Sequence, residues 1–371
     1  MHVKQLITPS FLVDLDILEE NIRDMALLCR LEGKELWPMI KTHKSSAIAK
    51  LQQQAGAAGF LTSTLDEAEG LVNSGISEIM LAYPVAGKEN ISKMIKMTDR
   101  ANIILSLDGS DAAEQLNERL KATHKILDYL IIIDCGLHRF GVAPDQAVDL
   151  AYRLQDLACL QLRGIATHPG HVYGAASFVE VAAIAAEEAV AMQTARESLQ
   201  NAGFNVGMVA TGSTPTVRQI ISTTEITAVR PGNYVFYDHI QVALGTVTEV
   251  RCAFTVLATI LSRPQADVLI IDAGSKCLGL DKGAHGNALL KGFGLVKGHA
   301  ELLITALSEE VGKIKICGPT SLNVGDKLQI IPNHACSAAN MTDYLIGHRK
   351  EIIEAILDVD MRGGTRQKPA I

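Results

Sequence analysis

The sequence predicts a closed (β/α)8 barrel followed by a smaller antiparallel β-domain. Two observations predict the barrel: aliphatic segments alternate with stretches of helical period, and polar residues stand where those segments end. A third observation predicts the second domain, because after Tyr237 the pattern changes to short segments of period 2 with frequent glycines. We expect the barrel over residues 10–240 and the β-rich domain over residues 241–371, with residues 1–9 packed against the β-domain.

Eight aliphatic segments account for the predicted barrel strands. They lie at about residues 36–41, 58–62, 78–82, 102–107, 128–134, 161–167, 206–212 and 226–236. The run Leu130-Ile-Ile-Ile133 is apolar without alternation, which is typical of a parallel sheet covered on both faces. Eight such units fit a closed barrel. A doubly wound open sheet, which has the same alternation of strands and helices, is the alternative.

Polar or glycine residues follow each predicted strand. In chain order they are Lys41, Ser63, Tyr83, Asp108, Arg139, His168, Ser213 with Thr214, and Gly232 with Asn233. The carboxyl ends of all strands in such a barrel meet at one face, and that face carries the active site of barrel enzymes. The pattern therefore predicts an enzyme.

Composition and charge exclude several classes of protein. The chain has 371 residues, of which 48% are hydrophobic and 20% charged, with a formal net charge of −7. The negative charge argues against nucleic acid or an anionic membrane as partner. We find no apolar run long enough for a membrane span and no signal-peptide pattern. Seven cysteines without regular spacing indicate a reducing compartment, so we expect a cytoplasmic protein. Separately, we expect the C-terminal tail from Arg362 onward to be flexible.

Lys41 stands at the end of the first predicted strand, in the run Ile-Lys-Thr-His-Lys. A lysine at such a position can hold an aldehyde cofactor as a Schiff base. Trp37 and Pro38 make its surroundings apolar, which favours the neutral, nucleophilic amine. We expect His43 and Lys44 to add positive charge in the same direction. The alternative is a solvated lysine without chemical function.

Two segments after the seventh and eighth predicted strands are candidates for binding a phosphate group. They are Thr211-Gly-Ser-Thr-Pro-Thr216 and Arg230-Pro-Gly-Asn-Tyr234. Small residues let the backbone approach an anion, hydroxyls donate hydrogen bonds, and Pro215 suits the first turn of a helix. Barrel enzymes frequently bind phosphate at these two strands. Ordinary strand-to-helix turns are the alternative.

Strands five and six contribute further polar candidates. Arg139 offers a fork of donors that can hold a carboxylate, a phenolate or a phosphate, although a surface salt bridge is the alternative. His168 can stack on a cofactor ring or carry protons. His171, three residues later, is as well explained by a structural hydrogen bond.

His334 and Cys336 are a candidate metal pair in the second domain. They flank one residue, so in an extended segment both side chains leave the same face. Two protein ligands would leave positions open for water or substrate, as in catalytic rather than structural metal sites. A buried cysteine beside an exposed histidine is the alternative.

The residues named above resemble those of fold-type III pyridoxal-phosphate enzymes with an alanine-racemase-like barrel, and more specifically the D-serine dehydratase and D-threonine aldolase group. The resemblance rests on the Lys-Thr-His-Lys box, the turn Gly136-Leu-His-Arg-Phe-Gly141, residues 231–238, the run Asp272-Ala-Gly-Ser-Lys, and the pair His334 and Cys336. This chain departs from the group in two places. It has Trp37-Pro-Met39 in place of Arg-Pro-His, and Ala166 with Thr167 where an aromatic hydroxyl is common.

The resemblance implies the roles of individual residues. Lys41 would carry the Schiff base of pyridoxal phosphate, and His168 would take part in catalysis. The cofactor would be bound by Arg139, His168, Tyr173, Ser213, Thr214, Arg230, Gly232, Asn233 and Tyr234. His334 and Cys336 would bind a divalent metal, zinc by preference and manganese or magnesium as alternatives.

The activity implied is a lyase for small D-amino acids with a β-hydroxyl, by dehydration or by retro-aldol cleavage. A homodimer with sites completed across the interface is implied as well. Two alternatives remain open: an amino-acid racemase of the alanine racemase type, and a non-catalytic protein that binds pyridoxal phosphate for its homeostasis.

Overall fold

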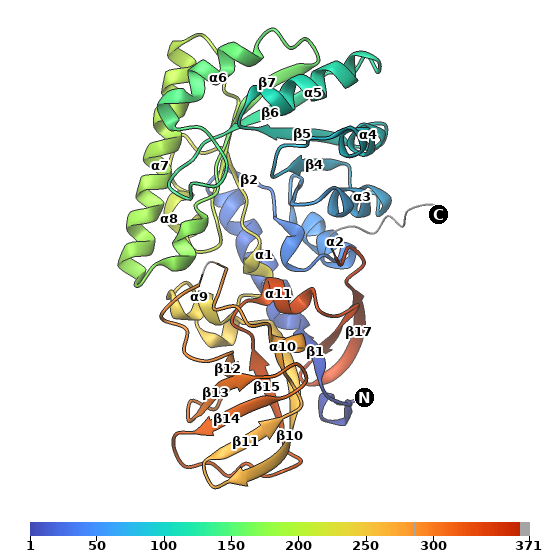
Figure 1. Ribbon diagram of the computed structural model, residues 1–371, viewed down its shortest axis with the longest axis vertical. Helices are drawn as coiled ribbons and strands as arrows, with labels where there is room; N and C mark the ends of the chain where they lie inside the picture. Colours follow the sequence, from blue (N-terminus) through green and yellow to red (C-terminus); the bar gives the residue numbers. More distant parts are fainter. Residues whose placement is uncertain (285, 364–371) are drawn as a thin grey trace.

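A barrel of eight parallel strands forms one half of the molecule, and its prediction is confirmed (Figure 1). The computed structural model describes residues 1–284 and 286–363. The barrel strands are β2 (Glu35–Leu36), β3 (Phe60–Thr62), β4 (Glu78–Leu81), β5 (Asn102–Leu107), β6 (Leu127–Ile132), β7 (Leu160–Ala166), β8 (Met208–Thr211) and β9 (Ala228–Val229). Their order is β2-β9-β8-β7-β6-β5-β4-β3. A parallel bridge between Met39 and Leu61 joins the two ends, so the sheet is closed and the open-sheet alternative is wrong.

The first and last strands are shorter than predicted. β2 ends at Leu36 rather than at Lys41, and β9 covers two residues of the segment predicted at 226–236. Proline explains both ends, because Pro38 and Pro231 have no N–H for a strand ladder and restrict the residue before them. Beyond these prolines the chain forms the short 3-10 helices η2 (Ile40–Thr42) and η5 (Asn233–Val235).

Amphipathic helices cover the outside of the barrel. They are α1 (Leu15–Leu31), α2 (Ser46–Ala55), α3 (Leu65–Asn73), α4 (Lys88–Met97), α5 (Ser110–Lys121), α6 (Ala147–Leu154), α7 (Phe178–Asn201) and α8 (Val217–Ile220). One apolar layer lies between strands and helices and includes Ile103, Ile131 and Leu150. A second fills the barrel interior around Trp37, Met80 and Leu130. Burial on both sides of the strands explains their unbroken apolar runs.

The second domain is built on a nine-stranded sheet below the barrel in Figure 1. Its strands are β1 (Ser10–Asp14), β10 (Phe254–Gln265), β11 (Val268–Ile271), β12 (Leu295–Val296), β13 (Leu302–Leu307), β14 (Gly312–Ile316), β15 (Lys327–Ile331), β16 (Tyr344–Arg349) and β17 (Ile352–Asp358). The pairs are antiparallel except β1 with β16. Because β1 lies in this sheet, the chain starts in the β-domain and then enters the barrel through α1.

Short helices of the second half lie between the two domains. They are α9 (His239–Ala243), α10 (Ser275–Leu278) and α11 (Ala335–Ala339). In Figure 1, α11 lies at the boundary between the barrel and the β-domain. The chain after β17 returns to the barrel, where the Met361 N–H donates to the Lys44 carbonyl at 2.9 Å. Arg362, where the predicted flexible tail begins, donates to the Asp343 carboxylate at 2.7 Å, and residues 364–371 of that tail lie outside the described residues.

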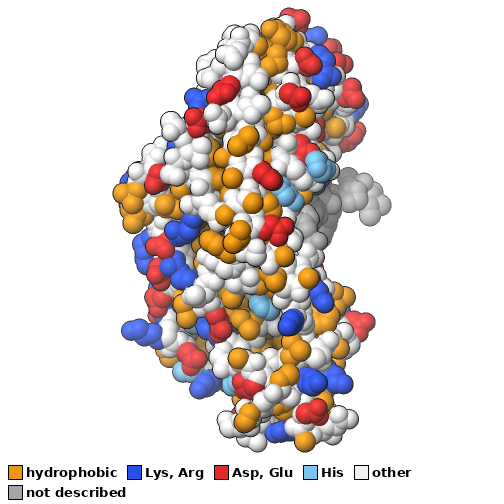
Figure 2. Space-filling view, turned by 90° about the vertical axis from the view of Figure 1, so that its left-hand side faces the viewer, with side chains coloured by type: hydrophobic (Ala, Val, Ile, Leu, Met, Phe, Trp, Pro, Cys, Tyr) orange, Lys and Arg blue, Asp and Glu red, His pale blue; other side chains and the backbone are white. Residues whose placement is uncertain are grey.

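The surface on the side of α7 carries both signs of charge. Figure 2 shows lysine and arginine side chains interspersed with aspartate and glutamate over this face. Within residues 1–284 and 286–363, no helix has both the length and the apolar character that crossing a bilayer requires.

Candidate active site

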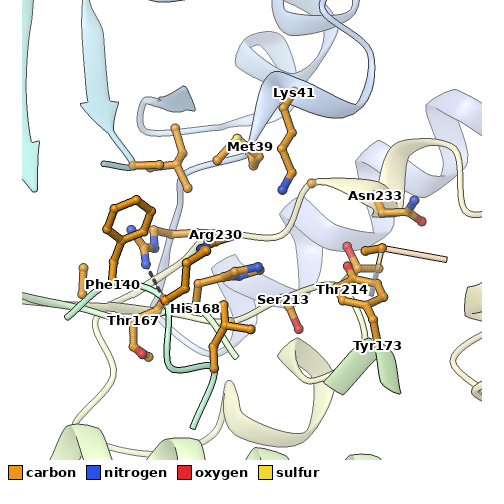
Figure 3. A pocket seen from close by; sticks show the side chains of 18 of the residues that line it. Met39, Lys41, Phe140, Thr167, His168, Tyr173, Ser213, Thr214, Arg230 and Asn233 are labelled. Carbon is orange, nitrogen blue, oxygen red and sulfur yellow. Dashed lines mark hydrogen bonds between the residues drawn. The ribbon is translucent and has the colours of Figure 1, made fainter. Parts of the chain in front are cut away.

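A cavity of about 220 Å³ opens at the carboxyl ends of the barrel strands, where the β-domain meets the barrel. Of the residues expected to bind the cofactor or a metal, all but Tyr234 line it: Lys41, Arg139, His168, Tyr173, Ser213, Thr214, Arg230, Gly232, Asn233, His334 and Cys336. The strand-end residues Ser63 and Asp108 do not line it. Figure 3 shows the Lys41 side chain entering the cavity from one side, with His168 and Ser213 opposite. Strand-end residues of the barrel and the His334–Cys336 pair of the β-domain thus share one space.

Tyr234 is the exception. Its side chain is fully buried, and its hydroxyl accepts a hydrogen bond from the Gln52 amide at 2.8 Å. Only its backbone faces the site, because the Tyr234 N–H donates to Thr214 Oγ1 at 3.1 Å. The Tyr234 ring therefore does not line the cavity, because η5 turns it into the apolar core, and cofactor binding by Tyr234 stays a prediction for its backbone alone.

Lys41 lies in the single 3-10 turn η2. The N–H groups of His43 and Lys44 donate to the Ile40 carbonyl at 3.1 and 2.9 Å and close this turn. His43 is buried, and burial lowers its pKa to about 4, so its ring is neutral. The expectation that His43 and Lys44 add positive charge next to Lys41 is thus wrong: the first is neutral and the second is paired.

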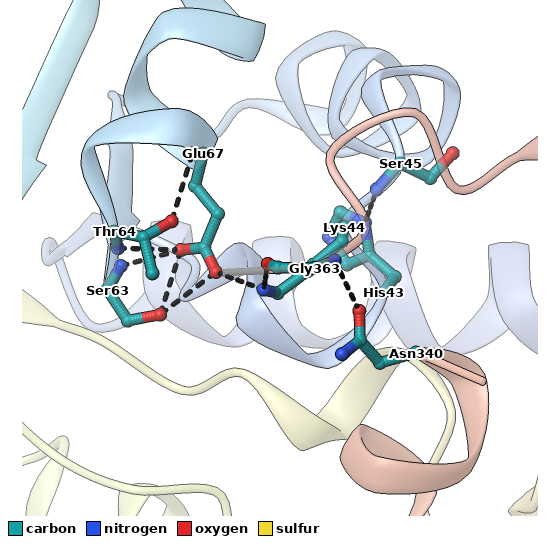
Figure 4. Close-up of polar contacts among 8 residues, drawn as sticks. All are labelled: His43, Lys44, Ser45, Ser63, Thr64, Glu67, Asn340 and Gly363. Carbon is teal, nitrogen blue, oxygen red and sulfur yellow. Dashed lines mark hydrogen bonds and ion pairs between the residues drawn. The ribbon is translucent and has the colours of Figure 1, made fainter. Parts of the chain in front are cut away.

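The partner of Lys44 is Glu67, which is fully buried (Figure 4). Lys44 Nζ lies 3.3 Å from Glu67 Oε1 and donates to the Gly363 carbonyl at 2.6 Å. Glu67 also accepts the Ser63 N–H at 2.6 Å. The Gly363 N–H in turn donates to Asn340 Oδ1 at 3.2 Å, directly after α11. These contacts tie the lysine turn to the barrel and, through residues 361–363, to the helix that carries Cys336.

The turn after β8 places two hydroxyls in the cavity. Gly212 has a φ of +97°, a left-handed conformation that favours glycine, and Ser213 and Thr214 follow it. Pro215 does not open a helix as predicted, because α8 begins at Val217 and has four residues. On the neighbouring β9 segment, a Cβ at Gly232 would lie 2.9 Å from the Met39 carbonyl oxygen. Glycine is thus required where this segment passes the lysine-bearing chain.

Arg139 reaches the cavity from a loop organised by Asp134. The Asp134 carboxylate accepts the N–H groups of Gly136 at 2.9 Å and His138 at 3.0 Å. The Arg139 guanidinium lies 5.3 Å from the ring centre of Tyr83 and 5.5 Å from that of Phe140, a cation–π geometry. It forms no ion pair with any described residue, so the surface salt bridge considered as its alternative role is wrong.

The two histidines after β7 have different surroundings. His168 lines the cavity. His171 lies outside the cavity lining and packs on the Arg139 loop, where its ring would be 3.1 Å from a Cβ at Gly136. The structural hydrogen bond considered for His171 is not seen, because its Nδ1 is buried without a hydrogen-bond partner among the described residues.

His334 and Cys336 do not lie on one extended segment as predicted. His334 has extended backbone, whereas Cys336 is the second residue of α11. The chain turns into α11 because the buried Asp238 carboxylate accepts the Ala335 N–H at 2.8 Å. Both side chains nevertheless line the cavity, since the helix begins between them.

Asp281 is a residue of the site that the sequence did not reveal. Its carboxylate lies 2.6 Å from His334 Nδ1 and accepts the Ser337 hydroxyl at 2.9 Å. Burial alone would lower the pKa of His334, but the Cys336 thiolate and Asp281 outweigh it and raise that pKa. Burial likewise opposes the Cys336 thiolate, yet the charge of His334 lowers the pKa of the thiol. The two shifts favour an imidazolium beside a thiolate; the thiolate is the form that binds metals, and His334 would release its proton when a metal binds.

His334 and Cys336 fit a metal whose remaining ligands would come from water or substrate rather than from this chain. A carboxylate on one ring nitrogen of a histidine is the usual arrangement around a metal-binding histidine, because it fixes the ring and its tautomer. Cys336 Sγ also lies 3.1 Å from Thr42 Oγ1, next to Lys41. Among the described residues no group of three or more histidine, cysteine or acidic side chains could hold a metal ion.

The barrel, its cavity lysine and the hydroxyl-rich turns define the class of fold-type III pyridoxal-phosphate enzymes. The family described as the alanine racemase N-terminal domain matches residues 13–239, and the serine dehydratase domain matches residues 253–347. The chain belongs to this alanine racemase N-terminal domain family, and the resemblance stated from the sequence is confirmed.

Proteins similar over nearly the whole chain sharpen this assignment. D-serine dehydratase of Dictyostelium discoideum is 30% identical, over 95% of this chain and 96% of that one. The structure of D-threo-3-hydroxyaspartate dehydratase from Delftia sp. HT23 has a TM-score of 0.89 at 27% identity, covering 98% of this chain and 100% of that one. That of D-threonine aldolase from Filomicrobium marinum has a TM-score of 0.88 at 25% identity, covering 98% and 97%. Such matches include the β-domain, which a barrel-only cofactor-binding protein would lack.

Proposed function

We propose that this protein is a lyase acting on small D-amino acids with a β-hydroxyl, using pyridoxal phosphate on Lys41 and a divalent metal on His334 and Cys336. The observation that carries the proposal is that Lys41 and this pair, which come from two domains, line one cavity. Two proteins similar in sequence or structure, D-serine dehydratase and D-threo-3-hydroxyaspartate dehydratase, are named for substrates of this kind.

The residues on the barrel side fit pyridoxal phosphate. Lys41 supplies the amine for the covalent link, Ser213 and Thr214 offer hydroxyl donors to the phosphate, and Arg139 offers a cation. When bound, the cofactor supplies an electron sink for charge that develops at the α-carbon of the substrate. Met39, Leu61 and Ala166 line the inner end of the cavity and exclude water from it.

The β-domain side fits a soft or borderline metal. A thiolate and an imidazole favour zinc over magnesium or manganese. A metal there would supply Lewis acidity to the substrate's β-hydroxyl. Asp281 orients His334, and Thr42 contacts Cys336, so both ligands are held toward the cavity. Racemisation moves only the proton on the α-carbon and requires no activation of a hydroxyl, so this pair favours the lyase.

His168 is proposed as the group that carries a proton between substrate and solvent, because it lines the same cavity as Lys41. Removal of the proton on the α-carbon with loss of the hydroxyl would give dehydration. Removal of the hydroxyl proton with cleavage of the bond between the α- and β-carbons would give glycine and an aldehyde. Both outcomes use the same residues.

The test is an assay of purified protein with D-serine, D-threonine and D-threo-3-hydroxyaspartate, with and without EDTA. Keto-acid and ammonia indicate dehydration, and glycine indicates retro-aldol cleavage. We expect one of these products from the D-substrates, none from the L-enantiomers, and loss of product on chelation. Racemisation that persists in EDTA would contradict the lyase and favour the alternative.

We also propose a homodimer in which one subunit's β-domain faces the cavity of the other. The support is the family's resemblance to alanine racemase. Sedimentation at assay concentration is the test. Full activity in a species that sediments as a monomer would contradict it.

A further inference from the structure

Glu188 is a fully buried acid on the inner face of α7, behind the turn that follows β8. Its Oε1 accepts the Gly212 N–H at 2.7 Å and also the Thr211 hydroxyl. Its Oε2 is buried without a hydrogen-bond partner among the described residues. A buried carboxylate with one oxygen unpaired is costly in its charged form, because that oxygen has lost its water.

Only the backbone of Gly212 separates Glu188 from the cavity. Gly212 has a left-handed φ of +97°, and its N–H donates to Glu188. The next two residues, Ser213 and Thr214, are the hydroxyl donors that line the cavity. Glu188 therefore holds the Gly212–Thr214 turn on the side away from the cavity and does not line the cavity itself.

Arg230 is a cation near Glu188, and its charge would be shared between Glu188 and a second anion at the turn. Burial raises the pKa of Glu188 to about 7, although the interactions with Thr211, Gly212 and Thr216 and the charge of Arg230 act in the opposite direction. Cys135 also interacts with Glu188, and it is a thiol kept neutral because burial raises its pKa to about 12. Arg230 itself donates to the Thr167 carbonyl rather than to Glu188. A phosphate at the turn would thus face a carboxylate across one peptide.

We propose that Glu188 takes up a proton when the phosphate of the cofactor occupies this turn, and that it thereby couples cofactor affinity to pH. Glu188 is a positioning residue in this proposal, which rests on the proposed function because it assumes pyridoxal phosphate at the turn. A protonated Glu188 still accepts the Gly212 N–H through Oε1 and no longer repels the phosphate.

The direction of the pH dependence follows from this linkage. Below the pKa of about 7 the acid is already protonated in the free protein, so binding requires no proton. Above that pH the proton must be taken up from solution. The apparent dissociation constant then rises by up to about tenfold per pH unit, until the pKa of the cofactor-bound form is reached.

The experiment compares the pyridoxal-phosphate dissociation constants of the wild type and Glu188→Gln between pH 6 and pH 9. Glutamine keeps the oxygen that accepts the Gly212 N–H and cannot ionise. We expect equal constants within about threefold at pH 6, and tighter binding by Glu188→Gln, about tenfold or more, at pH 9. The cofactor and Lys41 titrate in both proteins, so the ratio of the two constants isolates Glu188. The control is Glu187→Gln, an exposed neighbour on α7, whose ratio should stay near one.

Weaker binding by Glu188→Gln, by a similar factor at every pH, would overturn the proposal, since it would indicate an ionised Glu188 held by Arg230. Infrared difference spectra of wild-type protein labelled with 13C-glutamate give a second test that needs no variant. At pH 8, cofactor addition should produce a 13C-sensitive band of a protonated carboxyl, and its absence would contradict proton uptake. A wild type that binds no cofactor would overturn the proposed function as well, whereas parallel pH profiles with normal binding would overturn only this inference.

Discussion

The lysine turn and the His334–Cys336 pair face the same cavity but are held in place by different means. The lysine turn is locked by a buried ion pair, in which Lys44 and Glu67 have almost no exposure. The His334–Cys336 pair is oriented by hydrogen bonds to Asp281 and Asp238 at the start of a five-residue helix. Damage to the first region should therefore affect both folding and cofactor binding. Damage to the second should affect chemistry with little loss of stability.

The largest expected effect is that of Lys41→Ala. Loss of the amine removes the covalent attachment point, so turnover should fall by several orders of magnitude. The side chain is at the cavity surface and contributes little to the core, so the melting temperature should stay close to wild type. Borohydride reduction of wild type followed by peptide mapping checks the attachment directly. A label on Lys44 in place of Lys41 would contradict this assignment.

Cys336→Ala should abolish lyase activity while the protein stays folded and keeps its cofactor absorbance. The expected cause is loss of a metal ligand whose side chain faces the cavity rather than the core. Activity, metal content and thermal unfolding are measured on one preparation. Cys317→Ala, which removes an exposed thiol of the β-domain, is the matched control. Unfolding of Cys336→Ala but not of Cys317→Ala would make Cys336 a structural residue.

Lys44→Met should destabilise the protein by about 3–5 kcal/mol, since it leaves the Glu67 carboxylate buried without its cation. It should also weaken cofactor binding, because Lys44 continues the turn of Lys41. The double variant Lys44→Met with Glu67→Gln removes both charges and should recover part of the stability in a double-mutant cycle measured by urea unfolding. Lys50→Met, at an exposed position on α2, is the control. A stability loss for Lys44→Met equal to that of the control would contradict the stabilising role of the Lys44–Glu67 ion pair.

The smallest effect is expected for Asp281→Asn. The asparagine keeps a hydrogen bond to His334 but loses the charge that orients and polarises the ring. Metal affinity should fall by about 10–100-fold, as for other carboxylates that support a metal-binding histidine. Competition with a chromogenic chelator measures this affinity. An unchanged metal affinity would show that Asp281 plays no part in the site.

The barrel could be predicted because hydrophobic periodicity is local, and each strand and helix carries its own pattern. The residues that line the cavity could be located because strand ends of a barrel converge on one face. The buried residues that hold these cavity residues in place could not be predicted from one sequence. Asp281 meets His334 across 53 residues, and Glu188 occupies one position in a helix rich in acidic residues.

Differences between the prediction and the structure have the same origin. Tyr234 follows a motif whose neighbours face the cavity, yet η5 rotates its ring into the core. His43 was expected to be charged, but burial lowers its pKa to about 4, and burial is decided by the packing of distant segments. Local sequence patterns predict the course of the backbone, whereas burial and long-range partners decide the orientation and protonation of each side chain.

One measurement tests directly whether the two domains supply separable halves of the site. Pyridoxal phosphate and zinc are quantified per subunit in the same samples of wild type, Lys41→Ala and Cys336→Ala, after reconstitution with both and removal of excess. We expect both groups in wild type, zinc without covalently bound cofactor in Lys41→Ala, and cofactor without zinc in Cys336→Ala. Retention of zinc by Cys336→Ala, or loss of both groups from either variant, would contradict the division of the site between barrel and β-domain.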